Sequence, residues 1–411
     1  MGLKVWPREA GWLLAKWPRR AAPVALAIWL ALFTGGFGSA AAAPGEAPGP
    51  LTVENLIDQQ LEGLSLDSIH RFVDSLDAET REHVPAPDVR RLISEGDGID
   101  WGGLARSLVG VFVSEVRVNI SLLGQLVLLG VFCALLHHAA SAFKTAEAGE
   151  VAFFVSLLVL LLLGLQAFSA AAGLAAEAMR NMLDLMQALL PLLATMLAAA
   201  GAVTSAAIFH PLIYTTVTAI AALIDGALVP VVTISAVLAV LGSVSKEFPV
   251  KQLEGLVRTG VLTALGMVFI AFFAVVQVRG AIAPIADGFA FRTAKFLTGA
   301  FVPVVGGRIA DAMDVIVGGS VLIKNALGVF GMGAIAVVTA FPAVKIFAIL
   351  AVFRVATALI EPITDPRLVQ ALSGLAGSIS LLLAGLITAS LMFFVAVTVV
   401  VGVGNTAALM R

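Results

Sequence analysis

Long apolar runs dominate the chain after residue 117, and several reach the length that a membrane-spanning helix needs. The hydrocarbon layer of a bilayer takes about 20 mostly apolar residues to cross as a helix. The pattern therefore predicts an all-α, polytopic membrane domain over residues 118–411, with six to eight transmembrane helices. The clear spans are 118–138, 151–172, 185–208, 260–278, 326–353 and 379–403.

Two further apolar stretches predict broken or re-entrant helices. Residues 212–242 are too long for one simple span and hold Asp225, Gly226 and Pro230 near their middle. They predict either a long broken helix or a tight hairpin of two short ones, because backbone groups freed by Pro and Gly must be satisfied by neighbouring protein. Residues 299–322 are borderline in length.

Residues 281–298 predict a helix that lies at the membrane interface. Pro284 and Gly288 punctuate this stretch, and Arg292 and Lys295 lie three residues apart on one helical face. Basic residues flank the span at 260–278 on each side, so the positive-inside rule cannot place both flanks in the cytoplasm. An interfacial segment resolves that conflict.

The N-terminal residues 1–43 have the features of a secretory signal peptide. A basic region precedes the apolar segment Val24–Phe33 and the small-residue run SAAAA. The alternative is an uncleaved first membrane helix. In either case we expect the segment that follows to lie outside the cytoplasm.

That segment, residues 44–117, begins with the linker PGEAPGP and carries 14 acidic residues against six basic ones. Apolar residues recur near helical spacing over 53–66 and 69–76, which predicts a small helical extracytoplasmic segment. Its charge fits a solvated face or a docking surface for a basic partner, because charge steers association without identifying the partner.

Composition supports an integral membrane protein and gives little sign of chemistry. Hydrophobic residues make up 60% of the chain, charged residues 13%, and the mean hydropathy is +1.02, which leaves too little polar surface for a soluble body of this size. The sole cysteine, Cys133, excludes an intrachain disulfide and fits a packing role.

Motifs for catalysis or metal binding are absent from the sequence. His137 and His138 are adjacent, so they point to different faces of a helix and predict an ordinary interfacial helix end. No phosphate-binding loop and no GxSxG nucleophile motif occurs. We expect no enzymatic activity, cofactor, metal or nucleic-acid partner.

A set of polar residues within apolar surroundings is the candidate functional site. Ionisable groups at membrane depth must face protein, water or one another. Arg308, Asp311 and Asp314 share one helical face, and a second helix with Lys324 and Asn325 would complete a polar seam across the small residues 318–320. With the basic pair introduced above, the set comprises Arg292, Lys295, Arg308, Asp311, Asp314, Lys324 and Asn325.

Three roles for this polar set remain open: a structural lock between helices, an interface with a partner, and the lining of a conduit or ion path. If the seam exists, Asp311→Ala and Lys324→Ala should show energetic coupling. A stand-alone secondary transporter or permease subunit is the alternative function, with broken helices at 212–242 and 299–325 holding a solute near the midplane.

Several sequence blocks resemble the stage III sporulation protein AE family of endospore-forming bacteria. The resemblance covers nearly the whole chain after residue 115, and the stretch from DGFAFRTAKF to KNALG is long and specific. The blocks are LLHHAASAF at 135–143, EFPVKQLEGLVRTG at 247–260, RGAIAPIADGFAFRTAKFLTGAFVPVVGGRIADAMD at 279–314, SVLIKNALG at 320–328, and FPAVKI with EPITDPR.

The resemblance implies a polytopic subunit of the channel complex that joins mother cell and forespore. By that resemblance the chain would lie in the outer forespore membrane, in contact with membrane lipid. Its expected partners are an ATPase subunit, ring-forming membrane proteins of the same complex and a partner displayed from the forespore. The complex would support forespore development and late gene expression. The resemblance supplies no catalytic residues.

Overall fold

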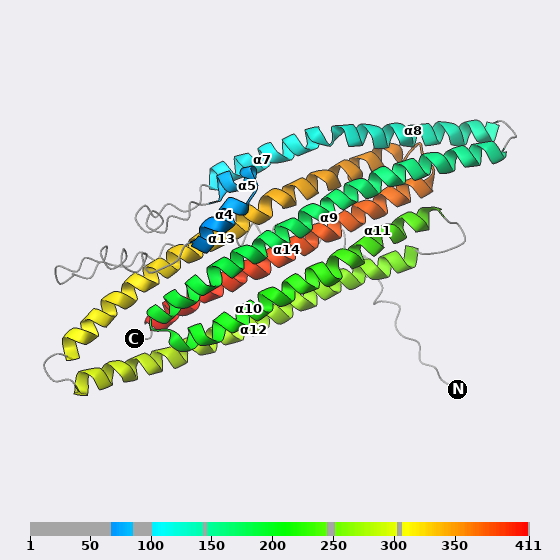
Figure 1. Cartoon of the computed structure of the whole chain (residues 1–411). Coiled ribbons are helices and arrows are strands. Elements are labelled where there is room, and N and C mark those ends of the chain that lie inside the picture. The colour runs from blue at the N-terminus through cyan, green and yellow to red at the C-terminus, as the bar shows by residue number, and fades with distance from the viewer. Residues whose placement is uncertain (1–66, 85–100, 143–145, 245–250, 302–305, 410–411) are drawn as a thin grey trace, which may run out of the picture. The chain divides into compact units, whose positions relative to one another are not determined.

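The structure is a computed structural model, and it describes residues 67–84, 101–142, 146–244, 251–301 and 306–409. Every regular element in these ranges is a helix (Figure 1), which confirms the predicted all-α class. The predicted signal peptide at 1–43 and the linker after it lie outside the described residues. The helices are α4 (Asp67–Ser75), α5 (Ala78–His83), α7 (Trp101–Val118), α8 (Ile120–Ala142), α9 (Ala146–Ala199), α10 (Val203–Leu223), the π-helical segment η1 (Ile224–Leu228), α11 (Val229–Val244), α12 (Lys251–Phe301), α13 (Gly306–Ile360) and α14 (Pro366–Leu409).

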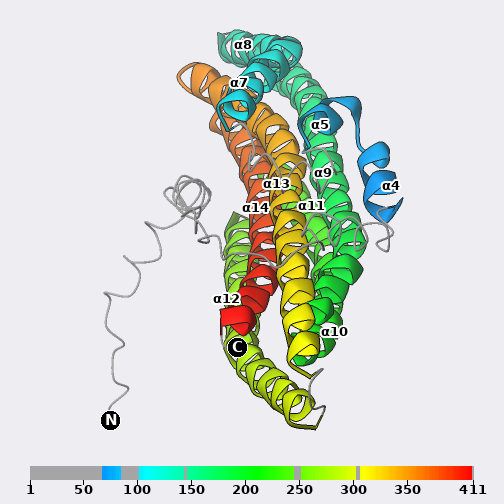
Figure 2. The same ribbon diagram turned by 90° about the vertical axis from the view of Figure 1, so that its left-hand side faces the viewer.

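The last helix of the chain, α14, lies at the centre of a bundle of long helices. It packs against α9, α11, α12 and α13, and α13 also packs along α9 (Figures 1 and 2). No ionisable side chain occurs in α14 after Arg367, and this is the pattern expected of a helix that is surrounded by apolar neighbours. Most of its side chains are buried.

Five helical segments are long and apolar enough to cross a membrane, and a sixth is gained if the bent pair α7 and α8 counts as one span. The structure thus has five or six candidate transmembrane helices, and six is the lower end of the predicted range of six to eight. The smaller number arises because several predicted spans are parts of one continuous helix. The segments are Phe154–Ala199, Val203–Ser243, Gln252–Thr293, Asp314–Ile360 and Pro366–Thr406.

The predicted span at 185–208 is wrong in its bounds. Helix α9 continues from the predicted span at 151–172 to Ala199 without interruption, and Pro191 lies within it. The chain turns at Gly201, whose φ of 75° is the left-handed conformation that glycine adopts at low cost. Helix α10 then begins at Val203.

Residues 212–242 form a broken helix, as one of the two predictions for this stretch stated. Helices α10 and α11 are joined through η1, which contains Asp225 and Gly226. A π-helical turn widens the backbone locally without reversing the chain. The alternative hairpin is not formed.

The predicted helix breaks before residue 281 and around residues 318–320 are also wrong. Helix α12 runs through Pro284, and helix α13 runs through both the glycine pair at 318–319 and Pro342. The predicted interfacial segment at 281–298 is thus the second half of α12. Proline is tolerated in such helices because packed neighbours satisfy the carbonyl groups that it frees.

The described parts of the segment 44–117 pack directly on the bundle. Helix α4, which matches the predicted helix at 69–76, contacts α9, while α5 and α7 contact α13. Ile69 and Phe72 of α4 are buried, and its remaining face is polar and exposed. Helices α7 and α8 meet at residue 119 with a bend of 41°.

Candidate functional site

Lys324 of the predicted polar set is fully buried, with an exposed fraction of 0%. Its ammonium donates to the backbone carbonyl of Val401 at 2.7 Å and to Oδ1 of Asn405 at 2.9 Å. Both acceptors belong to α14. A buried charge requires such partners, because an unpaired one would lose its hydration without compensation. Lys324 therefore joins α13 to the central helix.

A glycine of α14 makes room for this lysine. A Cβ atom placed on Gly404 would collide with the Lys324 ammonium, and it would lie 2.9 Å from Cδ of Lys324 and 2.9 Å from Cδ1 of Leu197. The absence of a side chain at this position lets the lysine lie flat against the α14 backbone. Small residues serve close approach of this kind in membrane helices.

The neighbouring Asn325 also carries a buried polar atom. Its Oδ1 has no hydrogen-bond partner among the described residues. A buried acceptor without a partner costs about 1–3 kcal/mol. Lys324 and Asn325 are neighbours on α13, and the contacts of Lys324 differ from those that the sequence predicted.

The structure does not bring Lys324 together with the predicted acidic partner. Asp311 and Lys324 lie on the single helix α13, 13 positions apart, which corresponds to about 20 Å along the axis. The predicted seam between two helices across residues 318–320 therefore does not form within this chain. Arg308 lies in the first turn of the same helix, and the side chains of Arg308 and Asp311 are outside the description.

The other predicted residues lie near the ends of α12 and α13. Arg292 is exposed on α12, and Lys295 follows it one turn later in the same helix. Asp314 is exposed on α13 and has a polar partner. These residues lie in the last turns of α12 and the first turns of α13, on either side of residues 302–305. They are therefore close to one end of both helices.

Sequence reasoning missed Asp287, which is 2% exposed. Its Oδ1 accepts from the backbone N–H groups of Thr204 at 2.8 Å and Ser205 at 3.3 Å, and its Oδ2 accepts from Ser205 at 3.1 Å. The N-cap residue of α10 is Ala202, which offers no side-chain acceptor. A carboxylate from α12 therefore caps α10, where the first N–H groups of a helix lack partners.

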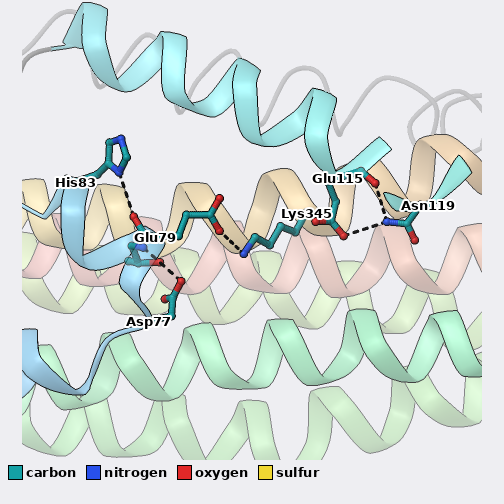
Figure 3. Close-up of polar contacts among 7 residues, drawn as sticks. Asp77, Glu79, His83, Glu115, Asn119 and Lys345 are labelled. Carbon is teal, nitrogen blue, oxygen red and sulfur yellow. Dashed lines mark hydrogen bonds and ion pairs between the residues drawn. The ribbon is translucent and has the colours of Figure 1, made fainter. Parts of the chain in front are cut away.

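A polar contact joins α5 to α13 (Figure 3). Nζ of Lys345 lies 2.6 Å from Oε2 of Glu79. His83 of α5 contacts Ser107 of α7 through Nε2 at 2.8 Å, and its ring lies 5.0 Å from that of Phe341. We call the contact between Glu79 and Lys345 the clasp.

Hydroxyl groups connect the three innermost helices at a similar level. Oγ1 of Thr339 lies 2.8 Å from Oγ of Ser390 and 3.2 Å from Sδ of Met182. It also donates to the carbonyl of Ile335, four residues earlier in α13, at 2.7 Å. These contacts satisfy the buried hydroxyl groups.

No group of three or more His, Cys, Asp or Glu side chains suited to a metal ion occurs within the described ranges. Cys133 is buried, as its predicted packing role requires. The polar residues found here join helices to one another. The fold and the buried polar contacts define a polytopic helical membrane protein.

Comparison with known proteins assigns the family. The family model described as stage III sporulation protein AE matches residues 87–404. The chain is also 32% identical over 366 residues to the protein named stage III sporulation protein AE from Bacillus subtilis (strain 168), covering 88% of this chain and 91% of that protein. The chain therefore belongs to the stage III sporulation protein AE family and has a role in sporulation. No solved structure matches it significantly.

Proposed function

We propose that this chain is a non-enzymatic integral membrane component of the channel complex that links mother cell and forespore. In this proposal it resides in the outer forespore membrane. It assembles there with an ATPase subunit, with ring-forming membrane proteins and with a partner protein from the forespore side. The complex then supports forespore development and late sporulation gene expression.

The observation that carries the proposal is the extent of the family match. It covers residues 87–404, which hold all the long helices except the last five residues of α14. Within the described residues, Lys324, Asp287 and Thr339 each contact a group on a neighbouring helix, as in a scaffold. A role in an assembly fits this arrangement better than a catalytic role does.

The polar residues at the ends of α12 and α13 are the proposed assembly or conduit surface. Arg292 is exposed there, and Lys295, Arg308, Asp311 and Asp314 belong to the same two stretches of helix. Rim charges set association rates and partner choice more than they set stability. Arg292→Glu should therefore weaken assembly without lowering the amount of folded protein, whereas Arg180→Glu on α9 serves as an exposed control.

The test is purification of an affinity-tagged chain from sporulating cells in mild detergent. Recovery of the ring-forming proteins and the ATPase subunit with the tagged chain, and reduced recovery with Arg292→Glu alone, would support the proposal.

The broken helix at η1 keeps a transporter as the second candidate, because broken helices hold solutes in that class. Solute flux by the purified chain in liposomes, without partners, would favour the transporter and contradict the channel subunit.

A further inference from the structure

Helix α9 carries a polar stripe along its exposed face. Its ten exposed residues from Gln166 to Thr195 include no large hydrophobic side chain. Apart from one pair of neighbours, successive members lie three or four positions apart, so they share one straight helical face. That face extends about 44 Å along the axis. The stripe consists of Gln166, Ser169, Ala170, Gly173, Glu177, Arg180, Asp184, Gln187, Pro191 and Thr195.

Helix α12 exposes the opposite kind of surface. Residues 259–278, which we call the apolar segment, contain no ionisable side chain and extend about 30 Å, the thickness of the hydrocarbon layer. Gln277 is exposed as well, but it points about 100° away from its neighbour Val278. Large apolar side chains are exposed along the segment, as contact with lipid requires: Met267, Ile270, Phe273, Val275 and Val278.

Contacts with the central helix give the level of the apolar segment. A Cβ atom placed on Gly377 of α14 would lie 3.2 Å from Nη1 of Arg258, which immediately precedes the segment. Near its other end, a Cβ atom placed on Gly280 would lie 2.8 Å from Cγ1 of Val399 in α14. The apolar segment therefore lies beside the part of α14 between Gly377 and Val399.

The polar stripe lies beside the same part of α14. Before the stripe, a Cβ atom placed on Gly164 would lie 2.6 Å from Cδ1 of Leu375 in α14. After the stripe, Cδ1 of Leu197 lies 2.9 Å from the position of a Cβ atom on Gly404. The stripe thus runs along the whole length of α14 that lies beside the apolar segment.

At this level the bundle is polar on one side and apolar on the other. Helix α14 lies between α9 and α12 (Figures 1 and 2). A bilayer that surrounds the apolar segment also reaches the level of Glu177, Arg180 and Asp184, which are exposed on α9. Ionisable groups at this depth must face protein, water or one another. Lipid alone cannot cover this side of the bundle.

Other ionisable residues at this depth belong to elements around α9. Lys345 of α13 lies about 9 Å along the helix from Thr339, which contacts Ser390 of α14. In the clasp, Lys345 pairs with Glu79 of α5, and the preceding helix α4 packs on α9. Asp225 belongs to η1, which packs on both α9 and α14. Water on this side of the bundle would hydrate these polar elements.

Three arginines mark the borders of the layer. Arg258 and Arg279 flank the apolar segment on α12. Arg354 of α13 follows Phe353, whose Cε1 lies 3.8 Å from the position of a Cβ atom on Gly164, just before the stripe. A long side chain at such a border reaches the membrane interface while its stem stays in apolar surroundings.

We propose that the polar stripe of α9 is one wall of a water-filled path across the bilayer, and that the apolar segment of α12 contacts lipid at the same depth. The stripe spans the thickness of the hydrocarbon layer, as such a path requires, whereas an ion pair with a partner needs one level only. Because lipid cannot face the stripe, a second protein surface completes the path. Two carboxylates and one guanidinium give the wall mixed charge, which suits hydrophilic solutes of either sign.

The inference does not rest on the proposed function, because it uses only exposure, spacing and levels. A path through a channel complex and a path through a transporter both need a hydrated wall. Since the stripe faces water and not the side chains of a partner, Arg180→Glu remains a control in the co-purification of partners.

The test is the accessibility of nitroxide spin labels on single cysteines in the full-length chain, in a background that carries Cys133→Ala. The tagged protein is purified from sporulating cells with the proteins that accompany it and is reconstituted in liposomes. Molecular oxygen, which concentrates in hydrocarbon, and a water-soluble nickel chelate serve as collision probes. The stripe sites are Glu177→Cys, Asp184→Cys and Gln187→Cys, and the α12 sites are Met267→Cys, Ile270→Cys and Val278→Cys, all of them exposed.

We expect collisions with the nickel chelate to exceed collisions with oxygen at the three stripe sites. At the three α12 sites we expect collisions with the nickel chelate to be lost and collisions with oxygen to remain. Gly173→Cys and Thr195→Cys, which belong to the same stripe, replace any stripe variant that aggregates.

Four results would overturn the proposal. Nickel collisions at the α12 sites would place this level of the bundle in water. Loss of both kinds of collision at the α12 sites would contradict their contact with lipid. At the stripe sites, loss of both kinds of collision would mean that protein packs directly on the stripe, and dominant oxygen collisions would mean that lipid covers it.

Discussion

At the scale of single residues, Lys324 is a cation held by neutral acceptors. Its two partners are a backbone carbonyl and the amide of Asn405, and neither removes the positive charge. Truncating one partner of a buried charge costs more than replacing both partners by apolar groups, because the remaining charge is left uncompensated. The pair should therefore behave as a unit in mutagenesis.

Asn405→Leu should lower the unfolding free energy by about 1–3 kcal/mol, because the Lys324 ammonium loses an acceptor. Lys324→Met should cost less, and the double variant Lys324→Met with Asn405→Leu should recover part of the loss. Thermal unfolding of the detergent-purified protein measures each Tm. Strictly additive losses in the double variant would show that the two side chains do not interact.

Gly404→Ala should lower Tm because the added methyl group collides with the Lys324 side chain and with Leu197. A misfit of this kind in a packed core costs about 1–3 kcal/mol. Gly402→Ala is the matched control, since a Cβ atom at Gly402 meets nothing within 4 Å. Equal effects of the two substitutions would contradict the packing seen around Lys324.

The sequence indicated Lys324 as important but not its partners. The signal was a charge within an apolar run, which identifies a residue that needs compensation and does not say where that compensation lies. Asn405 is 81 positions away on another helix, and no periodicity along one helix reports such a contact. The nearest acidic residues in sequence were therefore chosen wrongly. Asp287 carried the same signal and was passed over.

At the scale of secondary structure elements, the turn between α9 and α10 depends on a residue from α12. Ala202 cannot cap α10 by its side chain, and Asp287 supplies the acceptor from 82 to 83 positions away. The negative carboxylate also lies at the positive end of the α10 dipole. Formation of this helix end is thereby coupled to the packing of α12.

Asp287→Ala should destabilise the protein by about 1–2 kcal/mol through loss of the cap. Asp287→Asn should cost less, because its amide oxygen still accepts a hydrogen bond. Hydrogen exchange at the amides of Thr204 and Ser205, together with Tm, measures the effect. Arg292→Gln, an exposed substitution on the same helix, is the control. Unchanged exchange at both amides in Asp287→Ala would argue against the cap.

Proline and glycine were poor guides to where these helices end. Pro191, Pro284 and Pro342 all lie inside continuous helices. A sequence shows that proline lacks an N–H group, yet it does not show whether packed neighbours compensate for that loss. Gly201 does end a helix, with a φ of 75°, whereas the glycine pair at 318–319 lies within α13.

At the scale of the whole molecule, apolar composition and run length were sufficient for the fold class. They predicted helices in nearly all the right places, because a bilayer leaves few alternatives for an apolar chain. They did not show which runs are joined into one helix, since two spans in series and one long helix have the same composition. Composition and run length likewise did not predict that α14 lies at the centre of the bundle.

The position of α14 constrains the order in which the molecule can be made. This helix follows in the chain the five helices α9, α10, α11, α12 and α13 that pack against it. Until α14 has been synthesised, the helices before it lack the neighbour that they share in the fold, so this arrangement of the bundle can form only afterwards. A stop codon near Pro366 would remove the helix against which α9, α11, α12 and α13 pack. We expect the truncated chain to misfold and to be degraded by membrane proteases.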